Sequence, residues 1–164
     1  MKYPIGIQTF ANIRQEGYLY VDKTALVYQL AIAGKYYFLS RPRRFGKSLL
    51  ITTLEAYFQG RRELFRGLEM ERLEHDWTVY PVLHIDLNAA KYAEPEDLTA
   101  ILDGHLRYFE ESYGSNSAEQ NVAERFKGII RRALTSACSA PFTLISIVST
   151  GNCEYARGCV LLAN

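Results

Sequence analysis

The sequence lacks any long apolar run. No stretch approaches the ~18 continuous apolar residues of a membrane span, and residues 1–10 do not pair a basic segment with an apolar one as a secretory signal does. The net charge of +1 offers no general attraction to a polyanion. We therefore expect a cytoplasmic protein with no membrane partner, in which any contact with nucleic acid comes from a local patch.

Cysteine is scarce and confined to one end of the chain. The three cysteines are Cys138, Cys153 and Cys159. They form no CxxC pair, so a zinc site is not expected, and their odd number argues against a disulfide framework. We interpret them as reduced thiols without a functional role.

The remaining composition and patterning indicate an ordinary globular domain. Hydrophobic residues make up 48% of the chain and charged residues 23%. Apolar runs predict buried strands at 36–39 and 82–87, and 3.6-residue periodicity predicts helices between and after them. The predicted helices cover 23–33, 46–59, a segment that starts at Pro95, and a last one capped by Ser117 and Gln120. Helices that alternate with buried strands predict an α/β fold with a parallel sheet.

One strand–turn–helix unit carries residues suited to phosphate chemistry. Gly46, Lys47 and Ser48 open the helix that follows the strand at 36–39. Backbone N–H groups at a helix N-terminus point at anions, a lysine neutralises phosphate oxygens, and a serine hydroxyl ligates Mg²⁺. The spacing approximates the pattern GxxxxGK[ST], with Arg41 in place of the first glycine.

The same turn is strongly basic, with Arg41, Arg43, Arg44 and Lys47 within seven positions. Such positive charge at a helix start is unfavourable unless an anion is bound there. A nucleotide and the phosphates of a nucleic acid are the two candidate ligands. The third interpretation is an ordinary turn in which Gly-Lys-Ser is incidental.

With these motifs the chain resembles the bacterial AAA-ATPase-like family. The segments that carry the resemblance are 3–6, 20–24, 38–50 and 77–87. In that family RPRRFGKS is itself the Walker A signature, so Arg41 fits the family pattern. The resemblance implies a P-loop NTPase-type three-layer fold with a parallel sheet, here incomplete at the C-terminus. It also implies ATP and Mg²⁺ as cofactors.

The resemblance places phosphate and Mg²⁺ on Gly46, Lys47 and Ser48. We extend the expected cofactor site to the whole loop: Arg43, Arg44, Phe45, Gly46, Lys47, Ser48 and Leu49. Many relatives continue into a nuclease-like domain of the PD-(D/E)XK type, which this chain lacks. Nucleic acid is thus a further expected partner through that absent domain, beside any contact made by the basic loop.

The chain departs from the family where the Walker B carboxylates belong. An apolar run should lead into Asp-Glu, but residues 144–150 contain no carboxylate, and only Glu154 and Arg157 are charged among residues 133–164. A frameshift or truncation after about Arg132 explains both observations, and a divergent native tail is the alternative. We therefore expect the N-terminal part of an AAA-like ATPase domain at 1–132 and an atypical tail at 133–164.

Without those carboxylates no catalytic residue is assigned. Asp86 closes the second predicted strand and is a weak candidate for Mg²⁺ binding, against the preferred reading that it caps a turn. The sequence therefore predicts an ATP-binding P-loop domain that does not hydrolyse ATP as this chain. The alternative is a non-catalytic module whose basic loop binds nucleic-acid phosphates.

Overall fold

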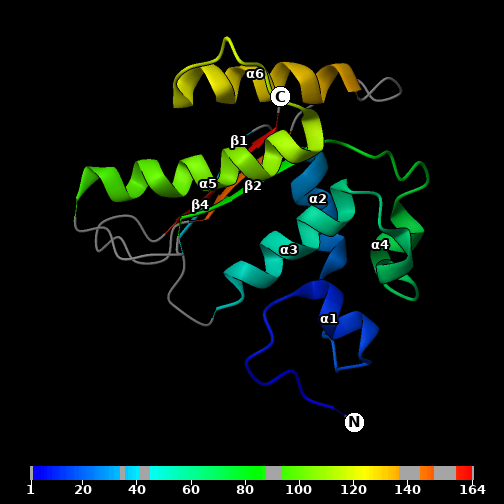
Figure 1. Cartoon of the computed structure of the whole chain (residues 1–164). Helices are drawn as coiled ribbons and strands as arrows, with labels where there is room; N and C mark the ends of the chain where they lie inside the picture. Colours follow the sequence, from blue (N-terminus) through cyan, green and yellow to red (C-terminus); the bar gives the residue numbers. More distant parts are fainter. Residues whose placement is uncertain are drawn as a thin grey trace.

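The computed structural model describes residues 2–33, 36–40, 45–87, 94–136, 145–149 and 158–163, and helices make up most of them (Figure 1). The helices are α1 (Phe10–Gln15), α2 (Thr24–Ala33), α3 (Lys47–Phe58), α4 (Glu69–Leu73), α5 (Pro95–Tyr113) and α6 (Val122–Ser136), with a 3-10 turn η1 (Arg62–Phe65). The strands are β1 (Tyr36–Ser40), β2 (Val82–Asp86), β3 (Ile145–Ser149) and β4 (Gly158–Ala163).

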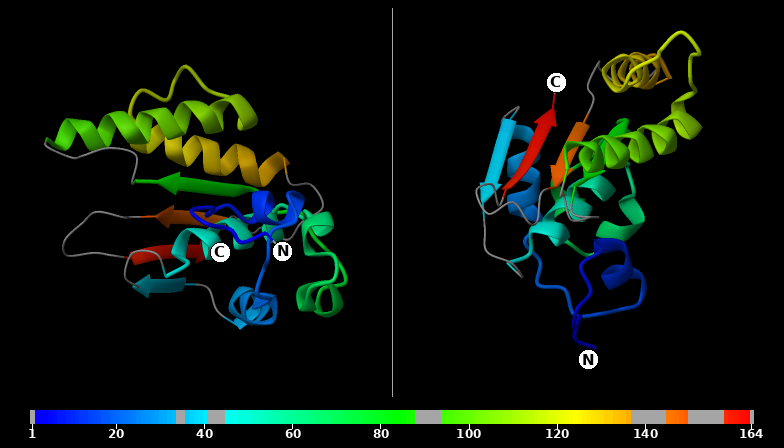
Figure 2. Two further views of the ribbon diagram at one scale, coloured as in Figure 1. Left: turned by 90° about the horizontal axis from the view of Figure 1, so that it is seen from below. Right: turned by 60° about the vertical axis from the view of Figure 1, so that its left-hand side comes forward.

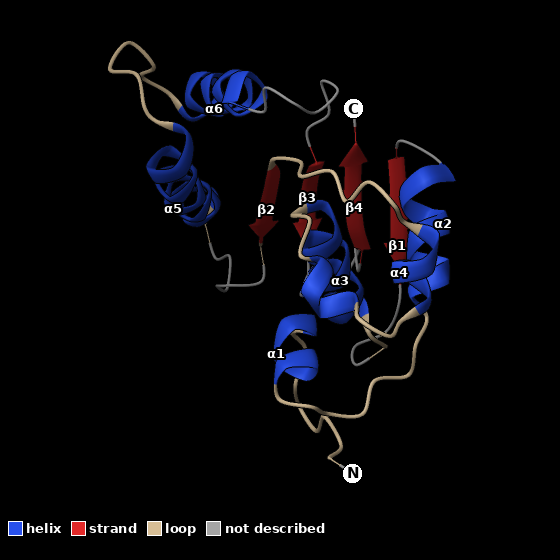
Figure 3. Cartoon of the chain, turned by 90° about the vertical axis from the view of Figure 1, so that its right-hand side faces the viewer, coloured by secondary structure: helices blue, strands red, loops and turns tan. Residues whose placement is uncertain are grey.

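The expected P-loop three-layer fold with a parallel sheet is wrong. The described strands form a mixed sheet in the order β1-β4-β3-β2, which Figure 3 shows side by side. Only β2 and β3 pair in parallel, because β4 runs antiparallel to both of its neighbours. The sequence pattern indicated strands at β1 and β2 but gave no sign that a segment of the tail would enter the sheet between β1 and β3.

The larger hydrophobic core joins α1, α2, α3, η1 and α4 to one face of the sheet. Its fully buried aromatic centre is Phe10 against Phe65, with ring centroids 4.9 Å apart. Trp77 packs edge-on against Tyr57 at 5.9 Å and extends this cluster. Full burial of one such side chain stabilises the fold by about 1.5–3 kcal/mol, so this core holds α3 in place.

Strand β2 separates this core from a second one. Leu83 and Ile85 are buried with α5 and α6, whereas Val82 packs against the larger core on the opposite face. The alternation follows from the two-residue repeat of a strand. Figure 2 shows α5 and α6 lying alongside each other next to β2. Among the described elements α6 packs mainly on α5, so these helices form a hairpin on the edge strand.

Local sequence explains how these two helices begin. Pro95 occupies the first turn of α5, and Glu94 and Asp97 form a reciprocal capping box in front of it. The predicted capping pair for α6 is wrong. Asn121 caps that helix instead, because its Oδ1 accepts the N–H of Glu124 at 2.9 Å.

Candidate functional site

The loop predicted to bind phosphate joins β1 to α3. Gly46 is the N-cap of α3 and has a φ of +76°, in the left-handed region. A residue with a Cβ loses about 1–2 kcal/mol in this conformation, whereas glycine adopts it freely. A Cβ at Gly46 would meet no atom within 4 Å, so backbone conformation and not crowding explains the glycine. The C=O of Gly46 accepts the N–H of Leu50 at 2.9 Å, which closes the first turn.

The N-terminal end of α3 is suited to an anion. Within the described residues it has no side-chain cap, and its first turn holds no acidic residue. The first N–H groups of an α-helix have no partner inside the helix, and the helix dipole adds positive potential at the same end. Lys47 and Ser48 stand in this first turn, so a cation, a hydroxyl and backbone donors converge on one helix end.

The structure brings five of the seven predicted loop residues together. Phe45 is 65% exposed and Ser48 is exposed, whereas Lys47 and Leu49 are half-buried. The Leu49 side chain packs against the larger core, which fixes the first turn of the helix. Arg43 and Arg44 lie outside the described residues, as does Arg41.

The N-terminal segment anchors α3 just beyond the loop. The Oγ1 of Thr52 accepts the first N–H of α1, from Phe10, at 3.0 Å. One turn further along, Glu55 lies 3.2 Å from Nδ1 of His84 on β2. These two contacts tie the helix to elements on either side of it, and so they hold its N-terminal end relative to the sheet.

Asp86, the weak candidate for metal binding, is half-buried at the carboxyl end of β2. It pairs in register with Ser149 of β3. Because β1 and β2 point in the same direction, the end of β1 that leads to the loop and Asp86 lie at one edge of the sheet. The intervening strands β4 and β3 separate Ser40 from Asp86 laterally.

The position where Walker B carboxylates were expected falls on β3. That strand ends in Ser149 and contains no acid, and Asp86 is the one carboxylate in the four described strands. Among the described residues no group of three His, Cys, Asp or Glu side chains is placed to hold a metal ion. Any Mg²⁺ here would therefore depend on few protein ligands and on water, as Mg²⁺ commonly does.

His105 lies near the end of β2 but has a packing role. Its Nε2 is 3.0 Å from the C=O of Asp86, and its ring stacks on Phe109 with centroids 6.3 Å apart. This contact fixes α5 against the last residue of β2. The histidine therefore has a structural role where α5 meets β2.

A group of hydrogen bonds around Asp22 lies at the start of α2. The carboxylate of Asp22 accepts the N–H of Thr24, the first residue of α2, and also the N–H of Glu69, the first residue of α4. Burial opposes ionisation of Asp22, but these hydrogen bonds prevail and lower the pKa of its carboxyl group. The segment 20–24, which belongs to the family pattern, thus joins two helices.

No helix in the described part of the chain is long and apolar enough to cross a membrane.

The described part of the predicted loop thus consists of a helix that starts at a left-handed glycine, with a lysine–serine pair in its first turn, directly after the segment that leaves β1. The family model described as Predicted AAA-ATPase matches residues 4–146. The chain belongs to this AAA-ATPase-like family, which confirms the resemblance seen in its motifs. The nuclease-like domain of some relatives stays a prediction.

One curated protein is similar to this chain over most of the chain's length. The protein described as "Uncharacterized protein in vnfD 5'region", from Azotobacter chroococcum mcd 1, is 43% identical over 134 residues. The aligned part is 80% of this chain and 26% of that protein, so the chain spans about a quarter of its relative's length. No solved structure matches the chain.

Proposed function

We propose that this chain binds ATP with Mg²⁺ through the loop that opens α3. The observation that carries the proposal is the left-handed Gly46 as N-cap, followed at once by Lys47 and Ser48 in a first turn without an acidic residue. Membership of the AAA-ATPase-like family supports nucleotide as the ligand. The cytoplasm, where ATP is abundant, is the compartment we propose for it.

Each residue of the loop has a distinct role in this proposal. Lys47 neutralises phosphate oxygens, the N–H groups of the first turn bind them, and the hydroxyl of Ser48 offers an oxygen ligand to Mg²⁺. We also propose that the carboxylate of Asp86, at the same edge of the sheet, binds a water molecule that is coordinated to the Mg²⁺. Mg²⁺ prefers oxygen ligands of this kind, so the donor set fits the ion. The bound ion would neutralise charge on the phosphates.

We further propose that this chain retains ATP without turning it over. Hydrolysis requires a group that orients the attacking water as well as a positioned metal. The strand at the expected Walker B position, β3, supplies no carboxylate. Asp86 alone would support metal binding but would leave the water without a general base.

The test is a titration of the full chain with Mg-ATP by calorimetry, in the wild type and in Lys47→Ala. A charge-assisted phosphate contact contributes about 1.5–3 kcal/mol, so affinity should fall by roughly tenfold to a hundredfold. Lys23→Ala is a matched control, because it removes an exposed lysine just before another helix, α2. Equal curves for wild type and Lys47→Ala contradict the proposal.

The basic character of the loop supports one rival function, the binding of nucleic-acid phosphates. Four basic residues fall within positions 41–47. Binding of DNA with a steep dependence on salt, and with no effect of Mg-ATP, would favour this alternative over nucleotide binding.

A further inference from the structure

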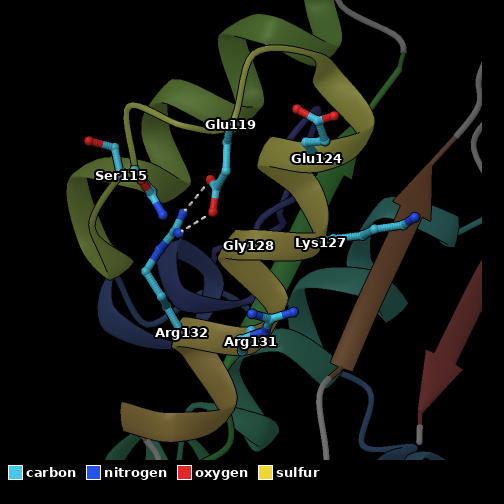
Figure 4. Close-up of a pocket in the computed structure, with 8 residues that line it drawn as sticks. Ser115, Glu119, Glu124, Lys127, Gly128, Arg131 and Arg132 are labelled. Carbon is cyan, nitrogen blue, oxygen red and sulfur yellow. Dashed lines mark hydrogen bonds and ion pairs between the residues drawn. The ribbon is translucent and has the colours of Figure 1, made fainter.

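A hollow of about 570 Å³ lies beside the turn that joins α5 to α6, away from the loop of α3. Its lining comes from the turn residues Ser115 and Glu119 and from one face of α6 (Figure 4). The lining residues of α6 include Lys127, Gly128 and Arg131, whose spacing places them on the same face of the helix. A hollow of this size accommodates a small ligand.

One wall of the hollow is a fixed ion pair. Arg132 donates to both oxygens of the Glu119 carboxylate, at 2.7 and 3.2 Å, and Figure 4 shows the two side chains pointing toward each other. The carboxylate rests on Gly128, where a Cβ would come within 1.9 Å of Oε1 of Glu119. A side chain at position 128 would therefore displace the Glu119 carboxylate, and glycine leaves room for it at the floor of the hollow.

The second carboxylate of the lining is also engaged. Glu124 accepts the N–H of Gln120 at 2.9 Å, beside the N-terminus of α6. The hydrogen bond from Gln120 lowers the pKa of Glu124 and keeps it ionised in this capping role. Both acids of the lining thus have hydrogen-bond partners within the protein, although Glu124 still attracts Lys127, one of the two exposed cations of the lining.

Those cations are Lys127 and Arg131, both exposed and four residues apart on α6. In the part of the chain that the structure describes, neither forms a salt bridge, whereas Arg125 on the same helix is bound by Asp103 and Glu110. Like charges at this spacing repel one another. An anion between them would relieve this repulsion and gain two charge-assisted contacts.

Two further polar groups belong to residues that line the hollow. The Nε–H of Arg132 is buried and has no hydrogen-bond partner among the described residues. Protein atoms cover this nitrogen, so it is not among the groups that the hollow offers to a ligand. The hydroxyl of Ser115, at the rim, adds a neutral donor.

We propose that this hollow is a second anion site, which binds a single phosphate group, free or carried on a small molecule, between Lys127 and Arg131. The two cations supply the charge, and the Arg132–Glu119 pair shapes the wall. The site is independent of ATP binding at Gly46–Ser48, because it lies on the other core and uses none of the same residues.

The test is an NMR titration of the full chain with inorganic phosphate, in parallel with AMP and with chloride at equal ionic strength. Saturable shifts of the backbone amides of Ser115, Lys127 and Gly128 are expected with phosphate or AMP, and the tighter of the two identifies the source of the phosphate. Lys127→Ala combined with Arg131→Ala should weaken this response at least about tenfold. Both side chains are exposed, so the double variant should fold.

Two further variants separate this site from the loop of α3. Lys47→Ala should keep the shifts near Gly128, even if the nucleotide proposal fails. Gly128→Ala should abolish them, because its methyl group displaces Glu119 and fills the floor. Shifts that match those in chloride, or that persist in the Lys127 and Arg131 double variant, would overturn the second site.

Discussion

The carboxylate of Asp22 accepts the backbone N–H of Glu69 at 2.8 Å, across 47 residues of chain. The same carboxylate accepts the N–H and the hydroxyl of Thr24, at 2.8 and 2.7 Å. The hydroxyl oxygen of Thr24 in turn accepts the N–H of Met70 at 3.0 Å. Asp22 and Thr24, which are hydrogen-bonded to each other, therefore accept backbone N–H groups at the start of both α2 and α4. These bonds fix the distance between the two helices.

Asp22→Ala should lower the free energy of unfolding by about 1–2 kcal/mol, which is the upper part of the range seen when a helix loses a capping side chain. The loss is large because the first N–H groups of two helices lose their acceptor together. Urea denaturation at neutral pH measures this loss. Glu63→Ala, which removes an exposed carboxylate from η1, is the control and should change the free energy of unfolding very little. A loss no larger than that of the control would show that water replaces the hydrogen bonds of Asp22 without cost.

The contribution of Asp22 should also depend on pH. Its folded-state pKa is lowered, so the stabilisation is complete above the unfolded-state pKa, about 3.9, and is lost as the pH falls through the folded value. The difference in unfolding free energy between wild type and Asp22→Asn should therefore shrink on acidification. A difference that stays constant down to about pH 2 would mean that the charge plays no part.

Gly46→Ala should destabilise the fold less than Gly60→Ala does. Both glycines have positive φ, at 76° and 68°. A Cβ at position 46 meets open space, whereas one at position 60 lies 2.7 Å from Cγ2 of Val79. The expected cost at position 46 is about 1–2 kcal/mol of backbone strain. Thermal unfolding ranks the two variants, and the reverse order would show that a side chain at position 46 is more crowded than one at position 60.

Tyr57→Phe should cost about 1.5–3 kcal/mol, because it removes the 2.5 Å hydrogen bond from a buried hydroxyl to the Glu74 carboxylate. Burial first and the carboxylate second raise the pKa of Tyr57. At Glu74, burial is outweighed by the hydrogen bonds from Tyr57 and Asp76, which lower the pKa. The variant should thus raise the pKa of Glu74, measured by NMR titration of its side chain. Tyr108→Phe, at an exposed position, should leave that pKa unchanged.

Phosphate release by the wild-type chain should be no faster than by Lys47→Ala, even though only the wild type binds Mg-ATP tightly. The reason is the absence of a carboxylate on β3, which leaves the attacking water unoriented. A steady-state assay on the full chain decides this. If the wild type does hydrolyse ATP, and both Lys47→Ala and Asp86→Asn abolish this activity, Asp86 has a catalytic role and does more than help to bind Mg²⁺.

Local structure could be predicted well where the signal was local. Helices α2 and α3 lie within a residue or two of their predicted bounds, and Pro95 opens α5 as expected. The direction and order of the strands could not be predicted, because they depend on contacts between distant segments. The entry of β4 between β1 and β3 is such a contact, and no periodicity in its short apolar run indicates a partner.

The candidate site shows the same division. The family motif places Gly46, Lys47 and Ser48 at a helix start, and the fold around them has the strand and helix that the motif requires. The second partner of Asp22 could not be predicted, because Glu69 is far away in sequence and contributes only its backbone N–H. The roles of Arg43 and Arg44 remain predictions.

Because the side chains of β2 alternate between the two cores, a single-residue insertion in this strand would exchange its two faces. Leu83 and Ile85 would turn toward α3, and His84 would be driven into the apolar cluster of α5 and α6. Both cores would lose packing at once, because β2 contributes side chains to each of them. The two halves of the molecule should therefore melt as one cooperative unit, with hydrogen exchange in α3 and α5 sharing the same opening free energy.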